Sequence, residues 1–556
     1  MINNLKMENV MNYKKYKKQY FDIPKSEHKW ADNSINKAPI WCSVDLRDGN
    51  QALYSPLTTD EKIEFFKFLV TLGFKEIEIG FPAASETEFE FSRRLIDENI
   101  IPDDVTIQVL TQAREHIISK TIDAVKGAKN VIIHLYNSTS EVQRRVVFGK
   151  GKKEILDLAV FGAKEIVDRV NKELDGNVRF EYSPESFTCT EPEYALEVCN
   201  AVLEVFNPTP DRKPIINLPS TIEISTPNIY ADQVEFIHKN INYRENIVLS
   251  VHAHNDRGTG IASTELGILA GADRVEGTIF GNGERTGNAD IITVALNMFC
   301  QGIDPGLSIE NIDEIISVYE KFIHIPINPR HPYAGDMAYV AFSGSHQDAI
   351  RKSFAEYEKS GKSYWQNPYL TIDPTDIGRL YEPIKINSQS GKGGVGYILE
   401  NKFGLVLPKE LLAVFAKEIT NISDRKQTVL EPTEIYDSFI NEYVNITSPY
   451  KLDKYSFETQ EDGTVIKAQI NGTDISAKGN GPLDALCEAV NNYLGTHIEI
   501  FAYSEHALER RASSKAVSYI AVKSNNNIFW GAGIDSNINT SSMYAFISAV
   551  NKINKN

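Results

Sequence analysis

Two histidines separated by one residue, His252 and His254, stand in the string HAHND at the end of a predicted strand. Side chains at positions i and i+2 of a β-strand point to the same face, so both imidazoles project in one direction. Such a pair supplies half of a metal site, because neutral imidazole is a common metal ligand. Taken in isolation, the pair also fits two hydrogen-bonded structural histidines.

Two further segments supply oxygen ligands that suit such a site. Asp48 lies in DLRDGNQ (45–51), after the first predicted strand, and Asn288 ends GNGERTGN (281–288), after the last. Imidazole combined with carboxylate and amide oxygens suits magnesium, manganese or zinc and leaves positions open for substrate, whereas structural zinc sites are usually closed by cysteines. We therefore predict a catalytic centre for a divalent metal.

Three other polar residues adjoin the proposed ligands or end predicted strands. Arg47 precedes Asp48, and its guanidinium could bind a carboxylate or stabilise an enolate oxygen. Glu185 and Thr221 close two middle strands and are candidate substrate contacts. An internal salt bridge is the alternative for Arg47, and helix capping or a surface position is the alternative for the other two.

The elements that must position these residues alternate between short β-branched apolar runs and amphipathic helical patterns. The predicted strands begin at residues 38, 75, 106, 130, 178, 214, 247 and 274. Eight βα units of this size are typical of a TIM barrel, with an open doubly wound sheet as the competing α/β architecture. In a barrel the carboxyl ends of the strands form the active site, and the polar residues named above stand at those ends.

The pattern changes after the eighth unit, and we predict four parts. An N-terminal extension (1–37) precedes the TIM-barrel catalytic domain (38–304). Residues 305–430 are predicted to form a mostly helical connector or lid with proline-rich corners. Residues 431–556 hold two strand-rich stretches, each near a helical pattern, and are predicted to form a small α+β domain.

Composition argues against several classes of protein. The formal charge of −17 repels nucleic-acid phosphates, so we do not expect the protein to bind nucleic acid. No apolar run reaches the roughly 18 residues of a membrane span, so we do not expect it to cross a membrane. The five cysteines are far apart and form no CxxC pair, which indicates reduced thiols and a cytoplasmic protein. The glycine-rich strings at 281–287 and 390–396 lack the spacings of dinucleotide and P-loop sites, so neither NAD nor ATP is expected.

Several strings resemble one enzyme family. WCSVDLRDGNQAL, FEYSPESFTCTE, HAHNDRGTG and RHPYAGDMAYVAFSGSHQDAI are similar to segments of α-isopropylmalate synthases, of the longer type with a leucine-sensing C-terminal domain. DLRDGNQ, HxHND and GNGERxGN also resemble motifs of homocitrate and citramalate synthases and of lyases related to hydroxymethylglutaryl-CoA lyase. The motifs therefore indicate the reaction class more narrowly than the substrate.

The resemblance implies a role for each candidate residue in the barrel. The implied metal ligands are Asp48, His252, His254 and Asn288. Arg47 would lie beside the reacting carbonyl, while Glu185 and Thr221 would position substrate or proton carriers.

The resemblance also implies roles outside the barrel. His346 and Tyr369 would complete the active site, supplied by the partner subunit of a homodimer. Without the resemblance, His346 fits a surface or capping histidine and Tyr369 a packed aromatic residue. The implied leucine-binding residues are Gly479, Gly481, Leu483 and Ile538, and the alternative for each is a turn or core position.

The implied reaction joins acetyl-CoA to 2-oxoisovalerate with a divalent metal, forms 2-isopropylmalate and CoA, and begins leucine biosynthesis under feedback by leucine. His346 is the first candidate for the base. Three alternatives stay open from the residues alone: a synthase acting on pyruvate or 2-oxoglutarate, a related metal-dependent lyase, and a non-catalytic amino-acid sensor.

Overall fold

The computed structural model describes residues 15, 17–24, 27–361, 364–379, 381, 392–426, 428–508 and 514–553. Much of the predicted N-terminal extension and residues 390–391 of the second glycine-rich string lie outside these ranges. The chain divides into two compact units, one of residues 1–338 with 375–379 and the other of residues 339–374 with 380–556.

Eight parallel strands close into a barrel in the first unit, running in order around the ring, with β8 paired to β1. The strands are β1 (Ile40–Ser43), β2 (Glu76–Gly80), β3 (Thr106–Gln112), β4 (Asn130–Ser138), β5 (Asn177–Glu185), β6 (Ile215–Ser220), β7 (Val248–Ala253) and β8 (Arg274–Gly277). Closure of the ring confirms the TIM barrel and excludes the open doubly wound sheet.

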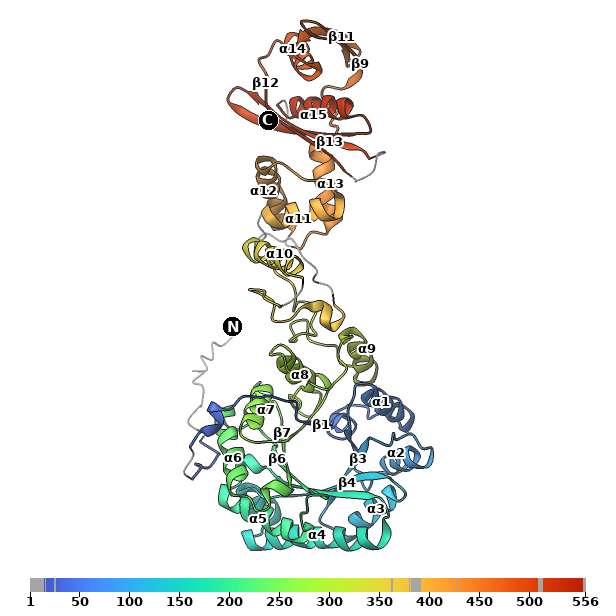
Figure 1. Ribbon diagram of the computed structural model, residues 1–556, viewed down its shortest axis with the longest axis vertical. Coiled ribbons are helices and arrows are strands. Elements are labelled where there is room, and N and C mark those ends of the chain that lie inside the picture. The colour runs from blue at the N-terminus through green and yellow to red at the C-terminus, as the bar shows by residue number, and fades with distance from the viewer. Residues whose placement is uncertain are drawn as a thin grey trace, which may run out of the picture. The chain divides into compact units, whose positions relative to one another are not determined.

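Helices surround the strands of the barrel (Figure 1). They are α1 (Thr59–Thr71), α2 (Glu86–Asp97), α3 (Glu115–Val125), α4 (Lys152–Glu173), α5 (Pro192–Phe206), α6 (Pro227–Asn240), α7 (Gly260–Leu269) and α8 (Ile291–Phe299). Local sequence explains where they begin: Thr58 and Glu61 form a capping box at α1, and Pro192 opens α5, where its missing N–H costs nothing.

The two faces of the barrel strands carry side chains of different chemistry. Ile77 and Ile79 of β2 are fully buried, and they alternate with Glu76 and Glu78, whose carboxylates meet residues of other strands across the ring. Since side chains alternate along a strand, the isoleucines belong to the apolar layer under the helices and the glutamates to the inside of the barrel. Branched apolar residues usually fill that inside, so the polar filling is a departure from the common pattern.

Helices follow the barrel, as predicted for the connector. They are α9 (Ile312–Ile323) in the first unit, and α10 (Gly344–Lys359), α11 (Lys392–Phe403), α12 (Lys409–Lys426) and α13 (Pro432–Tyr443) in the second. Among the described residues between 305 and 430, no extended strand forms. None of the described helices is long and apolar enough to cross a membrane.

Two three-stranded antiparallel sheets, each followed by a helix, form the end of the second unit. The first repeat contains β9 (Leu452–Gln460), β10 (Gly463–Ile470), β11 (Thr473–Gly479) and α14 (Pro482–Leu494), and the second contains β12 (Glu499–Ala507), β13 (Ala516–Ser524), β14 (Asn527–Asp535) and α15 (Ile538–Ile553). The predicted α+β class is confirmed, whereas the domain boundaries at 37, 304 and 430 stay a prediction.

Candidate metal centre and active site

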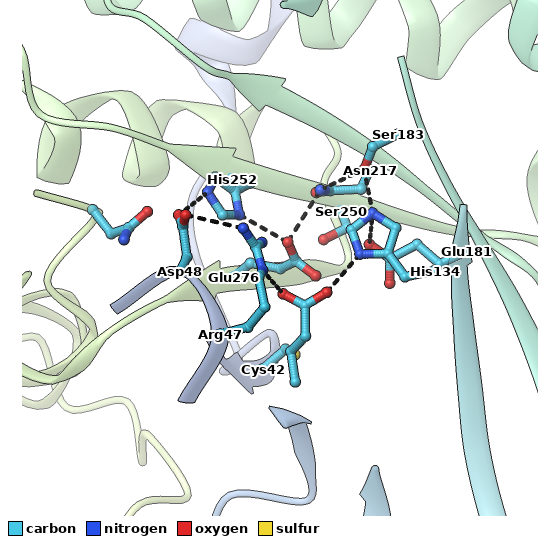
Figure 2. A network of polar contacts seen from close by, with 12 residues as sticks. Cys42, Arg47, Asp48, His134, Glu181, Ser183, Asn217, Ser250, His252 and Glu276 are labelled. Carbon is cyan, nitrogen blue, oxygen red and sulfur yellow. Dashed lines mark hydrogen bonds and ion pairs between the residues drawn. The ribbon is translucent and has the colours of Figure 1, made fainter. Parts of the chain in front are cut away.

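Asp48, His252 and His254 lie together at the carboxyl ends of β1 and β7. Asp48 belongs to a short π-helical turn (Asp45–Gly49) that follows β1, and its Oδ2 lies 3.3 Å from Nε2 of His252 and 3.6 Å from Nε2 of His254. All three side chains are buried. In Figure 2 the side chains of Asp48, Arg47 and His252 point toward one another. Closure of the barrel therefore brings the predicted ligands together.

Asn288 lies beside this group, because its backbone forms an isolated antiparallel bridge with His254. Its amide Nδ2 donates to the carbonyl of Asn282 over 2.9 Å. Gly287, with φ of +97°, makes the preceding turn in a backbone region that favours glycine. The loop after β8 thus fixes the orientation of the Asn288 amide, with Nδ2 engaged by the loop and Oδ1 available to another group.

Two buried side-chain oxygens of this group are suited to bind a cation. Asp48 Oδ2 and Asn288 Oδ1 are buried and have no hydrogen-bond partner among the described residues. A buried polar atom without a partner costs about 1–3 kcal/mol, and carboxylate and amide oxygens beside imidazole nitrogens are suitable ligands for a divalent metal. The geometry of these residues therefore supports a divalent-metal site.

Burial and charge set the protonation of the three ionisable candidate ligands. Burial alone would raise the pKa of Asp48, but Arg47 and the two histidines hold it well below its usual range. Burial opposes the charged form of His252, yet its contacts with Asp48 and Glu276 outweigh burial and raise its pKa to about 9. For His254, burial and the neighbouring His252 lower the pKa to about 4.

Arg47 is held by two carboxylates. Its Nε donates to Glu78 over 2.6 Å, and its Nη1 lies 2.9 Å from Asp48 Oδ1. The salt bridge considered as an alternative is therefore present, yet the same guanidinium also borders a cavity of about 160 Å³ at the barrel mouth. Fixed in this way, Arg47 presents a positive charge beside the candidate metal site.

Glu185 and Thr221 line the same cavity, as do Arg47, Asp48, His252 and His254. Ser138 donates its hydroxyl to the Glu185 carboxylate, and the Thr221 hydroxyl accepts a hydrogen bond from the backbone N–H of Ser186 over 2.9 Å. The predicted positions at the barrel mouth are thus observed, while the roles assigned to the residues stay predictions.

His346 and Tyr369 lie in the second unit, where their rings stack with centroids 4.0 Å apart. His346 is in the first turn of α10, and Tyr369 is 49 % exposed. The two residues thus lie side by side, with Tyr369 packed against His346 on one face, and their roles in the active site stay predictions.

The four implied effector residues gather at the beginnings of two helices. Gly479 ends β11, Gly481 is the N-cap of α14, and Leu483 lies in its first turn. Ile538 is the first residue of α15 and is 46 % exposed, which argues against the alternative of a core contact for this residue. The Tyr455 hydroxyl of β9 meets Thr540 of α15 at 2.8 Å and so links the two repeats.

Sequence reasoning missed the polar residues inside the barrel. Glu78, His134, Glu181, Arg274 and Glu276 are all buried there, and His134 Nδ1 lies 2.7 Å from the Glu78 carboxylate. The signal was the polar member of each alternating strand, as in EIEIG and RVEG. Alternation usually indicates a solvated face, so only closure of the barrel reveals these residues as internal.

One part of this internal set has metal-ligand atoms within reach of one another, namely His134, Glu181 and Glu276. Fully buried Arg274 lies 2.9 Å from Glu276 and 3.5 Å from Glu181, however, and already supplies a positive charge. Of the two groups, the one at the barrel mouth is therefore the better candidate for a metal.

A closed eight-stranded barrel with carboxylate, imidazole and amide ligands at the carboxyl ends of its strands defines a metal-dependent TIM-barrel enzyme. The HMGL-like family model matches residues 38–318, in agreement with that class. Two further models match the rest of the chain: "Alpha-isopropylmalate synthase, post-catalytic domain-like" at residues 336–400, and "LeuA allosteric (dimerisation) domain" at residues 429–554.

Full-length relatives narrow the class further. Proteins named 2-isopropylmalate synthase are 52 % identical in Acetoanaerobium sticklandii, 53 % in Clostridium acetobutylicum and 51 % in Helicobacter hepaticus, each over 98 % of this chain. The matches cover 97 %, 99 % and 100 % of those proteins. The chain belongs to the 2-isopropylmalate synthase family, whose members are acyltransferases, and the sequence-based expectation of such an enzyme is confirmed.

Proposed function

We propose that the chain joins acetyl-CoA to 2-oxoisovalerate and hydrolyses the resulting thioester, giving 2-isopropylmalate and CoA at the start of leucine biosynthesis. The observation that carries the proposal is the unsatisfied pair of oxygens, Asp48 Oδ2 and Asn288 Oδ1, beside two imidazoles at the barrel mouth. Such a ligand set suits a bidentate 2-oxo acid, because hard-oxygen and imidazole ligands leave open positions for substrate.

A bound magnesium, manganese or zinc ion would act as a Lewis acid that polarises the ketone of the oxo acid. The protein contributes a fixed positive charge, since Glu78 and Asp48 hold the Arg47 guanidinium at the cavity. We assign to Arg47 the stabilisation of the enolate oxygen of acetyl-CoA, where negative charge develops as the methyl proton leaves.

The proton transfers need groups of suitable chemistry at the reacting carbons. We assign the abstraction of the methyl proton to His346 of the partner subunit, directly or through water near Glu185, with the partner's Tyr369 as the ring that orients it. The resulting carbon nucleophile forms the new C–C bond to the ketone carbon as the C=O π bond breaks, and the alkoxide oxygen takes up a proton from water. Water then cleaves the C–S bond, CoA leaves as the thiol, and Thr221 helps to hold the oxo acid.

We further propose a homodimer that binds leucine near Gly479, Gly481, Leu483 and Ile538. Support comes from the match to the LeuA allosteric (dimerisation) domain and from the position of these residues at the beginnings of α14 and α15. Backbone N–H groups at helix N-termini favour the carboxylate of an amino acid. All five cysteines are free, which supports a cytoplasmic location.

Thiol release from acetyl-CoA tests the proposal when it is followed with 2-oxoisovalerate, pyruvate and 2-oxoglutarate in parallel. Each reaction is run with and without chelator and with and without leucine. We expect release to be fastest with 2-oxoisovalerate, to stop with chelator and to fall with leucine. A preference for pyruvate or 2-oxoglutarate would indicate a citramalate or homocitrate synthase.

A second arm separates condensation from the alternatives. The enzyme is incubated with the CoA thioester of 2-isopropylmalate, and the products are measured. A lyase would cleave the C–C bond and release acetyl-CoA with the oxo acid, whereas a synthase would hydrolyse the thioester and release CoA with 2-isopropylmalate. The absence of thiol release with all three oxo acids, in metal-loaded protein, would favour the amino-acid sensor.

A further inference from the structure

Glu276 of β8 occupies an unusual position, because its carboxylate lies fully buried at the centre of the barrel. Four side-chain nitrogen atoms surround it. Oε1 accepts from Arg274 Nη1 and from Gln108 Nε2, each over 2.9 Å. Oε2 meets His252 Nδ1 at 2.8 Å and accepts from Asn217 Nδ2 over 3.1 Å (Figure 2).

These contacts determine the chemical form of the carboxyl group. Three of its four neighbours, Arg274, Gln108 and Asn217, can only donate through the atoms that face Glu276. The Arg274 guanidinium is always charged, and its ion pair at 2.9 Å favours the ionised carboxylate over the protonated acid. The carboxylate is therefore the acceptor in its contact with His252.

The form of Glu276 determines the tautomer of His252. Since the carboxylate can only accept, Nδ1 of His252 carries the proton of that hydrogen bond. In the neutral ring Nε2 is then left with its lone pair, and Nε2 is the atom that lies 3.3 Å from Asp48 Oδ2. His254 lacks such a support, since its buried Nδ1 has no hydrogen-bond partner among the described residues.

We propose that Glu276 is a positioning residue for the metal site, which fixes the His252 ring and tautomer so that Nε2 faces the metal. The inference rests on the divalent-metal site proposed above. Arg274 Nη1 donates to Glu276 on the side away from His252, so the carboxylate is held between a fixed cation and the ring. The direct contact between Glu276 and Nδ1 of His252 is what supports the metal ligand.

The substitution Glu276→Gln tests the role of this carboxylate. The amide oxygen must face Arg274, whose guanidinium can only donate, so the NH₂ group faces His252. His252 then has to accept at Nδ1, and the proton of its neutral ring moves to Nε2, where it blocks a metal. We expect the Kd of the metal-free full chain for Mn²⁺ to rise by about 10- to 100-fold, the usual effect of losing an outer partner.

Glu76→Gln is the matched control. It removes the same charge from the same interior and from the same arginine, but Glu76 touches Arg274 and Arg179 rather than His252. We expect a Kd for Mn²⁺ close to that of the wild-type protein. Binding is measured from the signal of free Mn²⁺ in electron paramagnetic resonance, and melting temperatures of the metal-free variants report any general loss of stability.

Glu276→Asp covers the case in which the glutamine variant fails to fold. It keeps the charge for Arg274 but withdraws the carboxylate from His252 by one methylene, so the Kd should again rise. A folded Glu276→Gln or Glu276→Asp protein with wild-type affinity would overturn the inference, as would an equal loss in Glu76→Gln. If the wild-type chain binds no Mn²⁺, the metal site itself is wrong and the inference falls with it.

Discussion

Arg47 carries the electrostatic part of the proposed chemistry at the residue scale. Its planar guanidinium is held at two points, by Glu78 through Nε and by Asp48 through Nη1. Lysine offers a single charged nitrogen and cannot reproduce both contacts. For Arg47→Lys we expect kcat to fall by about 10²- to 10³-fold, as when one donor to a developing oxyanion is lost.

The kinetics of Arg47→Lys are measured in metal-saturated enzyme as kcat and as KM for both substrates. Mn²⁺ binding to the same variant serves as the control, since Arg47 itself is not a proposed ligand. A kcat equal to that of the wild-type enzyme would remove Arg47 from enolate stabilisation and leave it as a structural ion pair.

His252 gives the metal-free protein a characteristic pH dependence. Its pKa rises from 6.5 to about 9 in the folded chain, so the stability gained from its contacts is complete below pH 6.5 and is lost as the pH rises through 9. The pKa of His254 is lowered to about 4, so its contribution is instead lost as the pH falls from 6.5 through 4. We expect the melting temperature of the metal-free protein to be highest near pH 6.5.

Above pH 6.5 the affinity for a metal should rise with pH, whereas the melting temperature of the metal-free protein should fall. A metal must displace the proton on Nε2 of His252, so affinity should rise about tenfold per pH unit from pH 7 toward 9, with release of one proton. Calorimetric titration with Mn²⁺ in two buffers of different ionisation enthalpy measures that proton. Affinity independent of pH over this range would show that His252 is not charged in the metal-free protein.

At the scale of elements, the loop after β8 must hold Asn288 in place. A Cβ on Gly287 would lie 1.9 Å from the carbonyl oxygen of Gly281, in addition to the strain of a positive φ. We expect Gly287→Ala to cost more than the roughly 1–2 kcal/mol of that strain alone and to weaken Mn²⁺ binding. Chemical denaturation and Mn²⁺ titration measure the two effects.

Gly302→Ala is the control for this loop, because Gly302 also has a positive φ of +79° but nothing lies within 4 Å of an added Cβ. It should show the strain alone and bind Mn²⁺ normally. If Gly287→Ala binds the ion as tightly as the wild-type protein, the loop does not position a ligand.

The barrel elements were predictable because their local signals agree with the global fold. The strands at 106, 130 and 274 begin where the sequence predicts them, since each β-branched run is bounded by a turn. Parallel strands in a closed ring converge at their carboxyl ends, so the meeting of Asp48 with His252 also followed. Glu276 did not follow, because its partners come from β3, β6 and β7 and depend on the register of the whole ring.

At the scale of the whole molecule, the C-terminal repeats should transmit leucine binding to the enzyme. Gly481 offers a clean probe, because an added Cβ would meet nothing within 4 Å and its φ is ordinary for any residue. Gly481→Ala should therefore fold normally and lose only the stability that alanine costs at a helix N-cap, about 1 kcal/mol. If leucine binds at this turn, the added methyl group should raise the leucine concentration that gives half inhibition.

Inhibition curves with leucine for both proteins provide this comparison. Unaltered sensitivity to leucine in Gly481→Ala would place the effector elsewhere than the beginning of α14. The sequence indicated this turn only through family resemblance, since GNGPL by itself is also an ordinary N-terminal signal of a helix, with proline at the first position.

The central claim is that the barrel is a metal-dependent synthase acting on 2-oxoisovalerate. The most direct test is to titrate metal-free enzyme with Mn²⁺ and to measure bound metal and thiol release from acetyl-CoA and 2-oxoisovalerate in the same samples. We predict no release without metal and release in proportion to occupancy until one ion is bound at each barrel. Full turnover in metal-free enzyme, or bound metal without turnover, would contradict the claim.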